Sequence, residues 1–439
     1  MDLIKLNAVD ALNMMKRGEL TSEKYVTAFL DRIKVREPLV GAWNYLNHEQ
    51  AIQQAKLADK RWKDKNPGKL NGLPIGIKDI IDTKDMPTEN GSSICKNRMP
   101  TEDAHLVKLL RESGAVIMGK CVTTEFALSG PGKTKNPKDL ECTPGGSSSG
   151  SAAAVSDNMI PLAIGSQTGG SVLRPASFTG ILGFKPTFGT ISRYGMSPIS
   201  QRLDHPGIYA NSTCDIDLVA SVILSYDEKD LDMIKQYNYK QNYVIKTPKF
   251  AFVKGPVWDI GDKDMQEQII KFVENSPFDI EELNLGNDFN EAAHSHEVIM
   301  NGSIAKSLSH YYESEKEKLH PFTKSRIEAG IPVSAKQYIE AIENAKKMQQ
   351  TLSKFFNKFD AIITPAATGQ APRDLMNTGN AIFNGYWTMM GVPAISLPLL
   401  KGEDSLPIGV QIISSWNEDF KLLKIAEYIL QETKKLADY

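Results

Sequence analysis

Residues 142–177 read CTPGGSSSGSAAAVSDNMIPLAIGSQTGGSVLRPAS, a stretch that is poor in charge and rich in glycine and serine. It contains two Gly-Gly-Ser turns, at residues 145–147 and 169–171. Between the turns, the alanine-rich residues 151–159 suit a helix, and IPLAIG at residues 160–165 suits a buried strand. A serine placed directly after a buried strand projects from a rigid edge. The pattern therefore predicts an α/β domain that presents the second of these serines at its functional site.

The glycines before Ser171 predict a cluster of backbone donors. Residues without a Cβ tolerate unusual φ angles, so successive N–H groups can converge on one point. A developing oxyanion requires such convergence, and loss of one donor typically costs about 2.7–4 kcal/mol of barrier. The expected oxyanion hole consists of the backbone N–H groups of Thr168, Gly169, Gly170 and Ser171.

A serine hydroxyl is a weak nucleophile and needs a base. The seven histidines all lie outside the Gly/Ser stretch, whereas Lys78 stands inside the apolar sequence LPIGIKDII at residues 73–81. Burial disfavours the ammonium form and can lower a lysine pKa from about 10.4 toward neutrality, which would let Lys78 accept a proton. The alternative is an ion pair with Asp79 or Asp82, and the residues taken alone favour it.

Helices and strands alternate along the rest of the chain, as is typical of an α/β protein. Amphipathic helices are expected in residues 1–65, and HLVKLLRESGAVIMGK at residues 105–120 predicts a helix, a break and a short strand. Further strands are expected at AIITP, GVPAISLPLL and PIGVQIIS, before a closing helix through Phe420 and Ile429. A length of 439 residues fits one large domain or two ordinary ones.

Residues 255–359 differ from the rest in composition. They carry charge runs such as ESEKEKLH at residues 313–320 and no strand pattern beyond AFVKG at their border. We expect a helical elaboration that covers one side of the site and contributes to the substrate pocket.

The overall composition excludes several classes of function. Fifty-one basic and 53 acidic residues give a formal net charge of -2, which offers no strongly basic field for direct nucleic-acid binding. The four cysteines, Cys95, Cys121, Cys142 and Cys214, lack metal-binding or disulfide-framework spacing. No apolar run approaches the about 18 residues that a membrane helix requires, and the first residues lack a secretory pattern. A cytoplasmic location without membrane contact is expected.

Several ordered motifs closely resemble the amidase signature family. They cover residues 72–223 and 360–430 and comprise GLPIGIKD, GKCVTTEFALSG, PGGSSSGSAAAV, GSQTGGSVLRPASFTGILGFKPTFG, SQRLDHPGIYANSTCDIDL, GVPAISLPLL and LPIGVQ. The resemblance implies a single large α/β domain at residues 66–439, with a central mixed β-sheet flanked by helices on both faces. Residues 1–65 would then form an N-terminal helical segment that packs on this core.

The resemblance also implies a Ser-Ser-Lys catalytic triad. The family's nucleophile falls on Ser171, its relay serine on Ser147 and its base on Lys78. The relay serine of the family follows a cis peptide bond, which would be Gly146-Ser147 here. Such enzymes hydrolyse a linear amide through an acyl-enzyme and need no metal or organic cofactor. A small, polar or aryl amide is the expected substrate.

Some positions near the nucleophile depart from the family pattern. Gln167 stands where Asp is common, Ser149 where Gly is common, and Leu173 where Arg is common, with Arg174 one place later. The variant favours a stand-alone amidase over its alternative, the glutaminase (A-type) subunit of a transfer-RNA-dependent amidotransferase, which shares the same chemistry. The oligomeric state stays open, and a homodimer is compatible with the sequence.

Substrate binding is assigned to Ser148, Gln167 and Arg174. Arg174 could clamp a carboxylate or form a structural pair with an acid, and the residues favour neither interpretation over the other. Ser148 would alternatively be the nucleophile of a Gly-x-Ser-x-Gly elbow, but KNPKDLECTPG before it resembles a loop and not the required strand. A hydrogen bond from Ser148 to the backbone is the favoured role.

Other reactive or apolar side chains receive structural roles. Asp204 is expected to bond backbone, and Cys142 to be a small buried hydrophobe because no base adjoins it. His294 and His296 fit no metal-binding spacing and are assigned to surface or core. Trp387, Met389 and Met390 are assigned to core packing. A non-catalytic protein that binds an anion with these glycine loops is the remaining alternative of another class.

Overall fold

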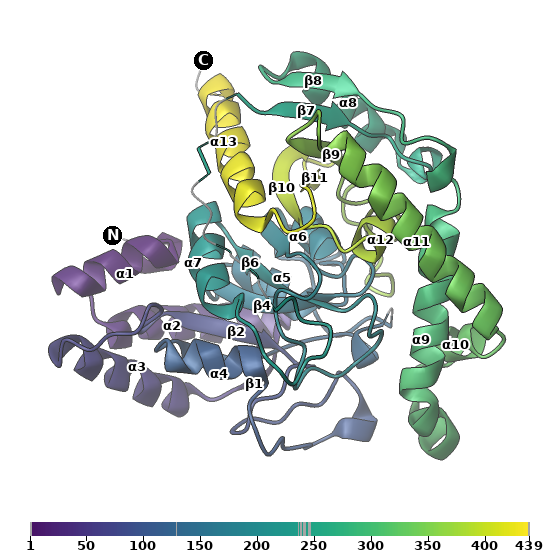
Figure 1. The fold of residues 1–439 in the computed structure, drawn as a ribbon. Coiled ribbons are helices and arrows are strands. Elements are labelled where there is room, and N and C mark those ends of the chain that lie inside the picture. Colours follow the sequence, from purple (N-terminus) through teal and green to yellow (C-terminus); the bar gives the residue numbers. More distant parts are fainter. Residues whose placement is uncertain are drawn as a thin grey trace.

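The computed structural model describes residues 2–128, 130–235, 237, 239, 243–244 and 247–437 as one domain around an eleven-stranded mixed sheet (Figure 1). Helices flank the sheet on both faces, so the predicted α/β class is confirmed. The strand order is β1-β3-β2-β4-β6-β5-β10-β11-β9-β7-β8. The strands are β1 (Trp43–Leu46), β2 (Pro74–Lys78), β3 (Val116–Cys121), β4 (Leu162–Gln167), β5 (Leu182–Lys185), β6 (His205–Ala210), β7 (Lys249–Phe252), β8 (Asp279–Glu282), β9 (Ala361–Pro365), β10 (Ala394–Lys401) and β11 (Pro407–Ile413).

The helices join these strands and cover the sheet. The α-helices are α1 (Ala8–Arg17), α2 (Ser22–Val40), α3 (His48–Lys63), α4 (His105–Glu112), α5 (Ser149–Ser156), α6 (Leu173–Thr179), α7 (Thr213–Ile223), α8 (Lys263–Asn275), α9 (Ala292–Glu315), α10 (Pro321–Gly330), α11 (Ala335–Phe355), α12 (Ile382–Met389) and α13 (Asp419–Ala437). The 3₁₀ turns are η1 (Leu3–Lys5), η2 (Ser93–Cys95), η3 (Glu125–Ala127), η4 (Trp258–Ile260), η5 (Asn287–Phe289) and η6 (Lys316–Lys318).

The N-terminal segment consists of α1 to α3 and one strand. The side chains of Asn7 and Thr21 accept backbone N–H bonds at the starts of α1 and α2, and Gly41 ends α2 in the left-handed conformation with a φ of 65°. Helix α2 continues through Pro38 and ends at Val40. Strand β1 lies in a segment for which the sequence indicates helices alone, and it pairs antiparallel with β3, which ties this segment into the sheet.

The catalytic motifs predicted from sequence lie at two adjacent inner strands of the sheet. Strand β2 lies between β3 and β4 and runs parallel to both. The carboxyl ends of parallel strands share one edge, so the last residue of β2, Lys78, lies beside the end of β4. Helices α5 and α6 follow the two Gly-Gly-Ser turns and contact strands β4 and β5, respectively. The predicted strand–turn–helix order around Ser171 is therefore present.

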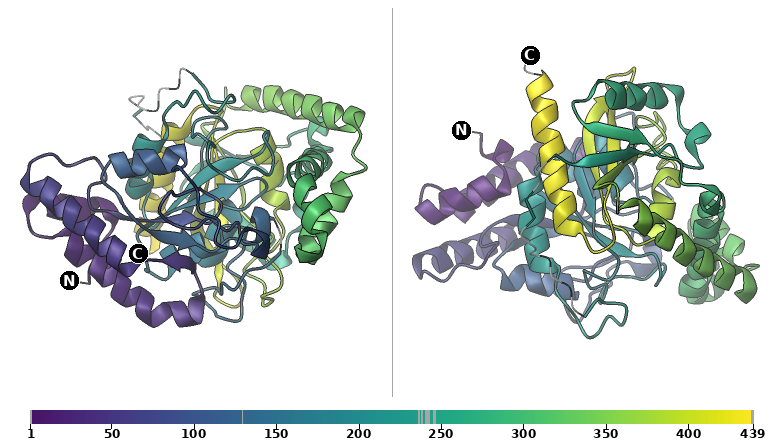
Figure 2. Two further views of the ribbon diagram at one scale, coloured as in Figure 1. Left: turned by 90° about the horizontal axis from the view of Figure 1, so that it is seen from below. Right: turned by 45° about the horizontal axis from the view of Figure 1, so that its top comes forward.

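Residues 255–359 are mostly helical, as expected, but they also contain a strand. Strand β8 pairs parallel with β7 at the sheet edge, and its four half-buried or exposed residues give no apolar alternation. Helices α10 and α11 each pack on α9, and the three lie at the opposite end of the molecule from α1 to α3 (Figures 1 and 2). Helix α9 also contacts α12, which places this elaboration beside the site.

Within the part of the chain that the structure describes, no helix is long and apolar enough to cross a membrane. The four cysteines are free, and Cys214 is the exposed one among them.

Candidate active site

Lys78 ends strand β2 with its side chain completely buried. Its Nζ donates hydrogen bonds to Ser147 Oγ at 2.7 Å and to Ser166 Oγ at 2.8 Å. Ser166 lies in β4, one residue before the strand ends, and this position places it next to Lys78. Ser166 is not among the candidate site residues predicted from the sequence. The lysine is thus surrounded by neutral hydroxyl groups.

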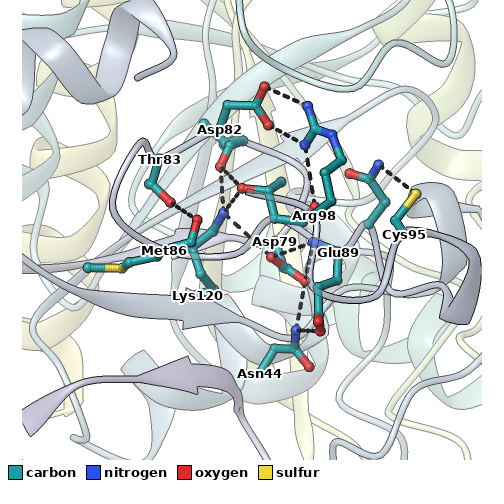
Figure 3. A network of polar contacts seen from close by, with 12 residues as sticks. Asn44, Asp79, Asp82, Thr83, Met86, Glu89, Cys95, Arg98 and Lys120 are labelled. Atoms are coloured by element: carbon teal, nitrogen blue, oxygen red, sulfur yellow. Dashed lines mark hydrogen bonds and ion pairs between the residues drawn. The ribbon is translucent and has the colours of Figure 1, made fainter. Parts of the chain in front are cut away.

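The acids next to Lys78 in sequence are bound by other cations. The Asp79 carboxylate faces the buried ammonium of Lys120, with an Nζ–Oδ1 distance of 3.5 Å. Asp82 accepts two bonds from the Arg98 guanidinium, at 2.7 and 2.9 Å. Figure 3 shows both pairs in one polar network. Lys120 also donates to the Ile81 carbonyl and to the Thr88 hydroxyl. Since Lys78 has no ion pair with any described residue, the ion-pair alternative raised by the sequence is wrong.

The two buried lysines differ in electrostatic environment. Burial lowers the pKa of Lys120 to about 8, although the nearby Asp79 carboxylate favours the ammonium form. Burial also raises the pKa of Asp79, to about 6. Burial lowers the pKa of Lys78 well below its ordinary value, with the Asp204 carboxylate as the opposing charge. Lys120 therefore has a carboxylate beside it that favours the ammonium, whereas Lys78 has hydroxyl partners that suit a neutral amine.

Ser147 lies on the loop before α5, and the Gly146-Ser147 peptide bond is cis, as the family resemblance implies. The loop is held by Arg174, whose guanidinium donates to the carbonyls of Gly146 (2.5 Å) and Thr378 (2.7 Å). Arg174 is buried and pairs with no described acid; two of its five N–H donors bind these carbonyls. In this structure Arg174 braces the loop that carries Ser147 while also lining the cavity described below.

Ser171 stands at the second Gly-Gly-Ser turn and lines a cavity of about 740 Å³. Its carbonyl accepts a bond from Tyr209 Oη at 3.0 Å. Its hydroxyl has no hydrogen-bond partner among the described residues, so the predicted contact between Ser147 and Ser171 is not formed here. The structure contains the first link of the expected relay, from Lys78 to Ser147. Hydrogen bonds of catalytic groups are often formed only when substrate is bound.

The backbone of residues 168–171 borders the same cavity. Its N–H groups have no acceptor among the described residues, whereas the carbonyls of Thr168, Gly169 and Gly170 all accept hydrogen bonds. An oxyanion requires unpaired donors at such a cavity wall. The oxyanion hole at residues 168–171 stays a prediction with which these unpaired N–H groups are compatible.

The other two residues assigned to substrate binding point away from the cavity. Ser148 Oγ donates to the Ser166 carbonyl (3.0 Å) and accepts from the Ser166 N–H (3.1 Å), which is the backbone role favoured for it. Strand β3 ends at Cys121, far before Ser148 in sequence, so the nucleophile-elbow alternative lacks its strand. Gln167 is buried, and its Oε1 accepts the N–H groups of Val172 and Leu173. Gln167 therefore shapes the turn behind the nucleophile and does not border the substrate space.

The remaining candidates take mostly structural positions. Asp204 accepts from Thr168 Oγ1 at 2.6 Å and from two backbone N–H groups, as expected. Burial raises the pKa of the Cys142 thiol, which disfavours a thiolate nucleophile. Trp387, Met389 and Met390 are buried in the core. Ser149 Oγ donates to the Val122 carbonyl. Leu173 is buried in α6.

Helices α9 and α10 supply cavity residues that the sequence did not indicate. His296, Glu297 and Arg326 line the cavity together with His294. Arg326 lies 3.8 Å from Glu297, and its buried Nε has no hydrogen-bond partner among the described residues. These residues come from a segment without motifs, so no pattern distinguished them from other charged positions. No group of three potential metal ligands occurs in the described residues.

Comparison with known proteins identifies the family. The protein-family model described as Amidase matches residues 24–423, which is nearly the whole chain. The chain belongs to the amidase signature family. The predicted resemblance is therefore confirmed, and members of this family hydrolyse carbon–nitrogen bonds.

Similar proteins include subunits of an amidotransferase as well as amide hydrolases. The A-type subunit of glutamyl-tRNA(Gln) amidotransferase from Clostridium botulinum is 32% identical, covering 97% of each chain, and that from Lachnoclostridium phytofermentans is 30% identical, covering 99% of this chain and 98% of its own. The native peptide amidase of Stenotrophomonas maltophilia has a TM-score of 0.83 at 26% identity. The match covers 98% of the present chain and 97% of the peptide amidase. The 6-aminohexanoate cyclic dimer hydrolase, at 21% identity and a TM-score of 0.86, shares the fold over 100% and 98% of the two chains.

Proposed function

We propose that this protein is an amidohydrolase that cleaves a linear carboxamide through an acyl-enzyme on Ser171. The observation that supports this most is the bond from a buried Lys78, free of any described ion pair, to Ser147 beside the nucleophile turn. A buried amine with hydroxyl partners is suited to accept a proton.

In the proposed first half-reaction, Ser171 Oγ attacks the amide carbonyl carbon. Its proton passes to Ser147 Oγ, and the proton of Ser147 passes to the neutral Nζ of Lys78. The oxyanion of the tetrahedral intermediate is stabilised by the N–H groups of residues 168–171. Lys78 then returns its proton through Ser147 to the leaving nitrogen, the C–N bond breaks, and ammonia or an amine departs.

The second half-reaction repeats the sequence with water as the nucleophile. Water attacks the acyl carbon of the Ser171 ester while its proton moves through Ser147 to Lys78. Collapse of the second tetrahedral intermediate breaks the bond to Ser171 Oγ, which recovers a proton along the same path. The product is a carboxylic acid, and every group returns to its starting protonation state.

The cavity favours a small polar amide. Its walls combine apolar residues such as Met300 and Ile382 with the cation of Arg326. The Arg326 guanidinium lines the cavity and can bind a carbonyl or carboxylate on the part of the substrate away from the scissile bond. An amide that carries a second polar group therefore fits better than a purely aliphatic one.

A glutaminase subunit of a transfer-RNA-dependent amidotransferase is the second candidate. It is favoured by the 32% identity, over nearly full length, to a protein named as a component of glutamyl-tRNA(Gln) amidotransferase. Glutamine is a small amide with a carboxylate, which the cation of Arg326 could bind. The two candidates differ in whether a partner protein is required.

Ammonia release by the purified chain alone separates the two candidates. The panel comprises glutamine, succinamic acid, butyramide and benzamide; the second and third have the same chain length with and without a carboxylate. We expect turnover of at least one amide without a partner, with succinamic acid ahead of butyramide by about 10-fold or more, as one charged hydrogen bond provides about 1.5–3 kcal/mol. A folded chain that releases ammonia from none of them would contradict the stand-alone amidase.

A further inference from the structure

The peptide units of the loop at residues 168–171 are each held by their carbonyl group. The Thr168 carbonyl lies 3.1 Å from His296 Nε2. The Gly169 carbonyl accepts from Thr388 Oγ1 at 2.7 Å, and the Gly170 carbonyl accepts from the N–H of residue 174 at 2.9 Å. Two of these three donors are side chains from α9 and α12, outside the Gly/Ser stretch.

These contacts determine where the loop's N–H groups point. In a trans peptide, the C=O of one residue and the N–H of the next point in opposite directions in one plane. A carbonyl fixed toward α9 or α12 therefore directs the following N–H away from that helix. His296 acts in this way on the N–H of Gly169, and Thr388 acts on the N–H of Gly170. Both residues 169 and 170 border the cavity.

The surroundings of His296 make it a donor at this position. Its partner is a carbonyl oxygen, so Nε2 must carry the hydrogen. Burial is the main cause that lowers the pKa of His296 to about 4, and the nearby Arg326 also lowers it while Glu297 and the Thr168 carbonyl raise it. The imidazole is thus neutral at ordinary pH, and its donor is constant across the range in which the enzyme would be assayed.

Glycine packing keeps the imidazole and the loop in contact. A Cβ added at Gly385 of α12 would lie 2.7 Å from His296 Nδ1, so only glycine leaves room for the ring. A Cβ added at Gly170 would lie 2.4 Å from Asn384 Oδ1. A side chain at Gly385 or Gly170 would therefore disturb the contacts that the loop makes with α9 and α12.

We propose that His296 is a positioning residue for the oxyanion hole: its Nε2–H holds the Thr168 carbonyl so that the Gly169 N–H faces the reacting carbonyl. This inference rests on the proposed acyl-enzyme chemistry at Ser171. His296 touches neither the nucleophile nor the relay through any hydrogen bond of the described residues. Thr388 has the same function for the next peptide unit.

The test removes the Nε2–H donor of His296 and keeps a side chain of similar volume at this position. His296→Phe removes the N–H, whereas His296→Gln retains one, and His310→Phe on the exposed side of the same helix is the matched control. We measure kcat and KM on the best amide of the panel above and the rate constant for phosphorylation by diisopropyl fluorophosphate, whose P=O oxygen uses the same N–H groups.

For His296→Phe we expect kcat and the phosphorylation rate to fall about 10-fold or more, with KM within about threefold. The reason is that loss of a direct donor costs about 10²–10³-fold, and a mispositioned donor less. His296→Gln should recover most of both rates. Thr388→Val, which removes the second side-chain donor, should give the same pattern and provides an independent result if His296→Phe does not fold.

Two results would overturn the inference. One is an unchanged kcat and phosphorylation rate in folded His296→Phe; the other is a raised KM at constant kcat, which would make His296 a substrate contact. Failure of the proposed function looks different, because then the unmodified protein itself neither hydrolyses an amide nor reacts with the fluorophosphate.

Discussion

Replacing Ser171 with alanine is expected to lower kcat/KM for the best amide by at least about 10³-fold while the protein stays folded. Removal of a serine nucleophile in comparable hydrolases eliminates nearly all catalysis beyond that of the oxyanion donors and binding. The side chain lines a cavity and its hydroxyl has no bond to a described residue, so its loss leaves no buried group unsatisfied.

The measurement is steady-state ammonia release, with the thermal midpoint as a check on folding. Ser93→Ala is the matched control because Ser93 is exposed. A Ser171→Ala protein with activity near that of the control would show that the nucleophile lies elsewhere.

Replacing Lys78 with methionine should have a comparable effect, a loss of about 10³-fold or more in kcat. Methionine fills the buried site without a proton acceptor, so Ser147 would retain its proton. Lys78→Arg should be as inactive, because a guanidinium stays protonated. Lys69→Met, at an exposed position, is the control.

The pH dependence of the unmodified enzyme tests the same residue. Burial lowers the pKa of Lys78 well below its ordinary value, and the Asp204 carboxylate partly opposes this shift. The amine is active when neutral, so kcat/KM should fall as the pH falls through this lowered pKa and reach a plateau above it. A rate that rises only near the ordinary lysine pKa would contradict a buried, neutral base.

The sequence predicted the strand–turn–helix units that carry the candidate site because these units depend on local patterns. Gly-Gly-Ser turns after apolar segments indicate strand–turn–helix units, and the Lys78 position within an apolar strand indicates burial. The parallel pairing of β2 and β4 then brings Lys78 to Ser147 and Ser166. The cis bond before Ser147 was implied by the family resemblance and is present.

Long-range contacts determined what the sequence could not show. Arg174 is bound to carbonyls that include Thr378, 204 positions along the chain, and nothing local distinguishes a carbonyl partner from a carboxylate. Strands β1 and β8 are four residues long, and edge pairing defines them more than apolar alternation does. His296 and Arg326 reach the cavity only through the packing of α9 on α12 and of α10 on α9.

The most direct test of the acyl-enzyme proposal is the mass of the purified protein after reaction with diisopropyl fluorophosphate, followed by peptide mapping. We expect a single covalent adduct on Ser171, formed at a rate that falls sharply in Lys78→Met. An adduct on Ser148, or an unmodified protein after prolonged reaction, would contradict the proposal.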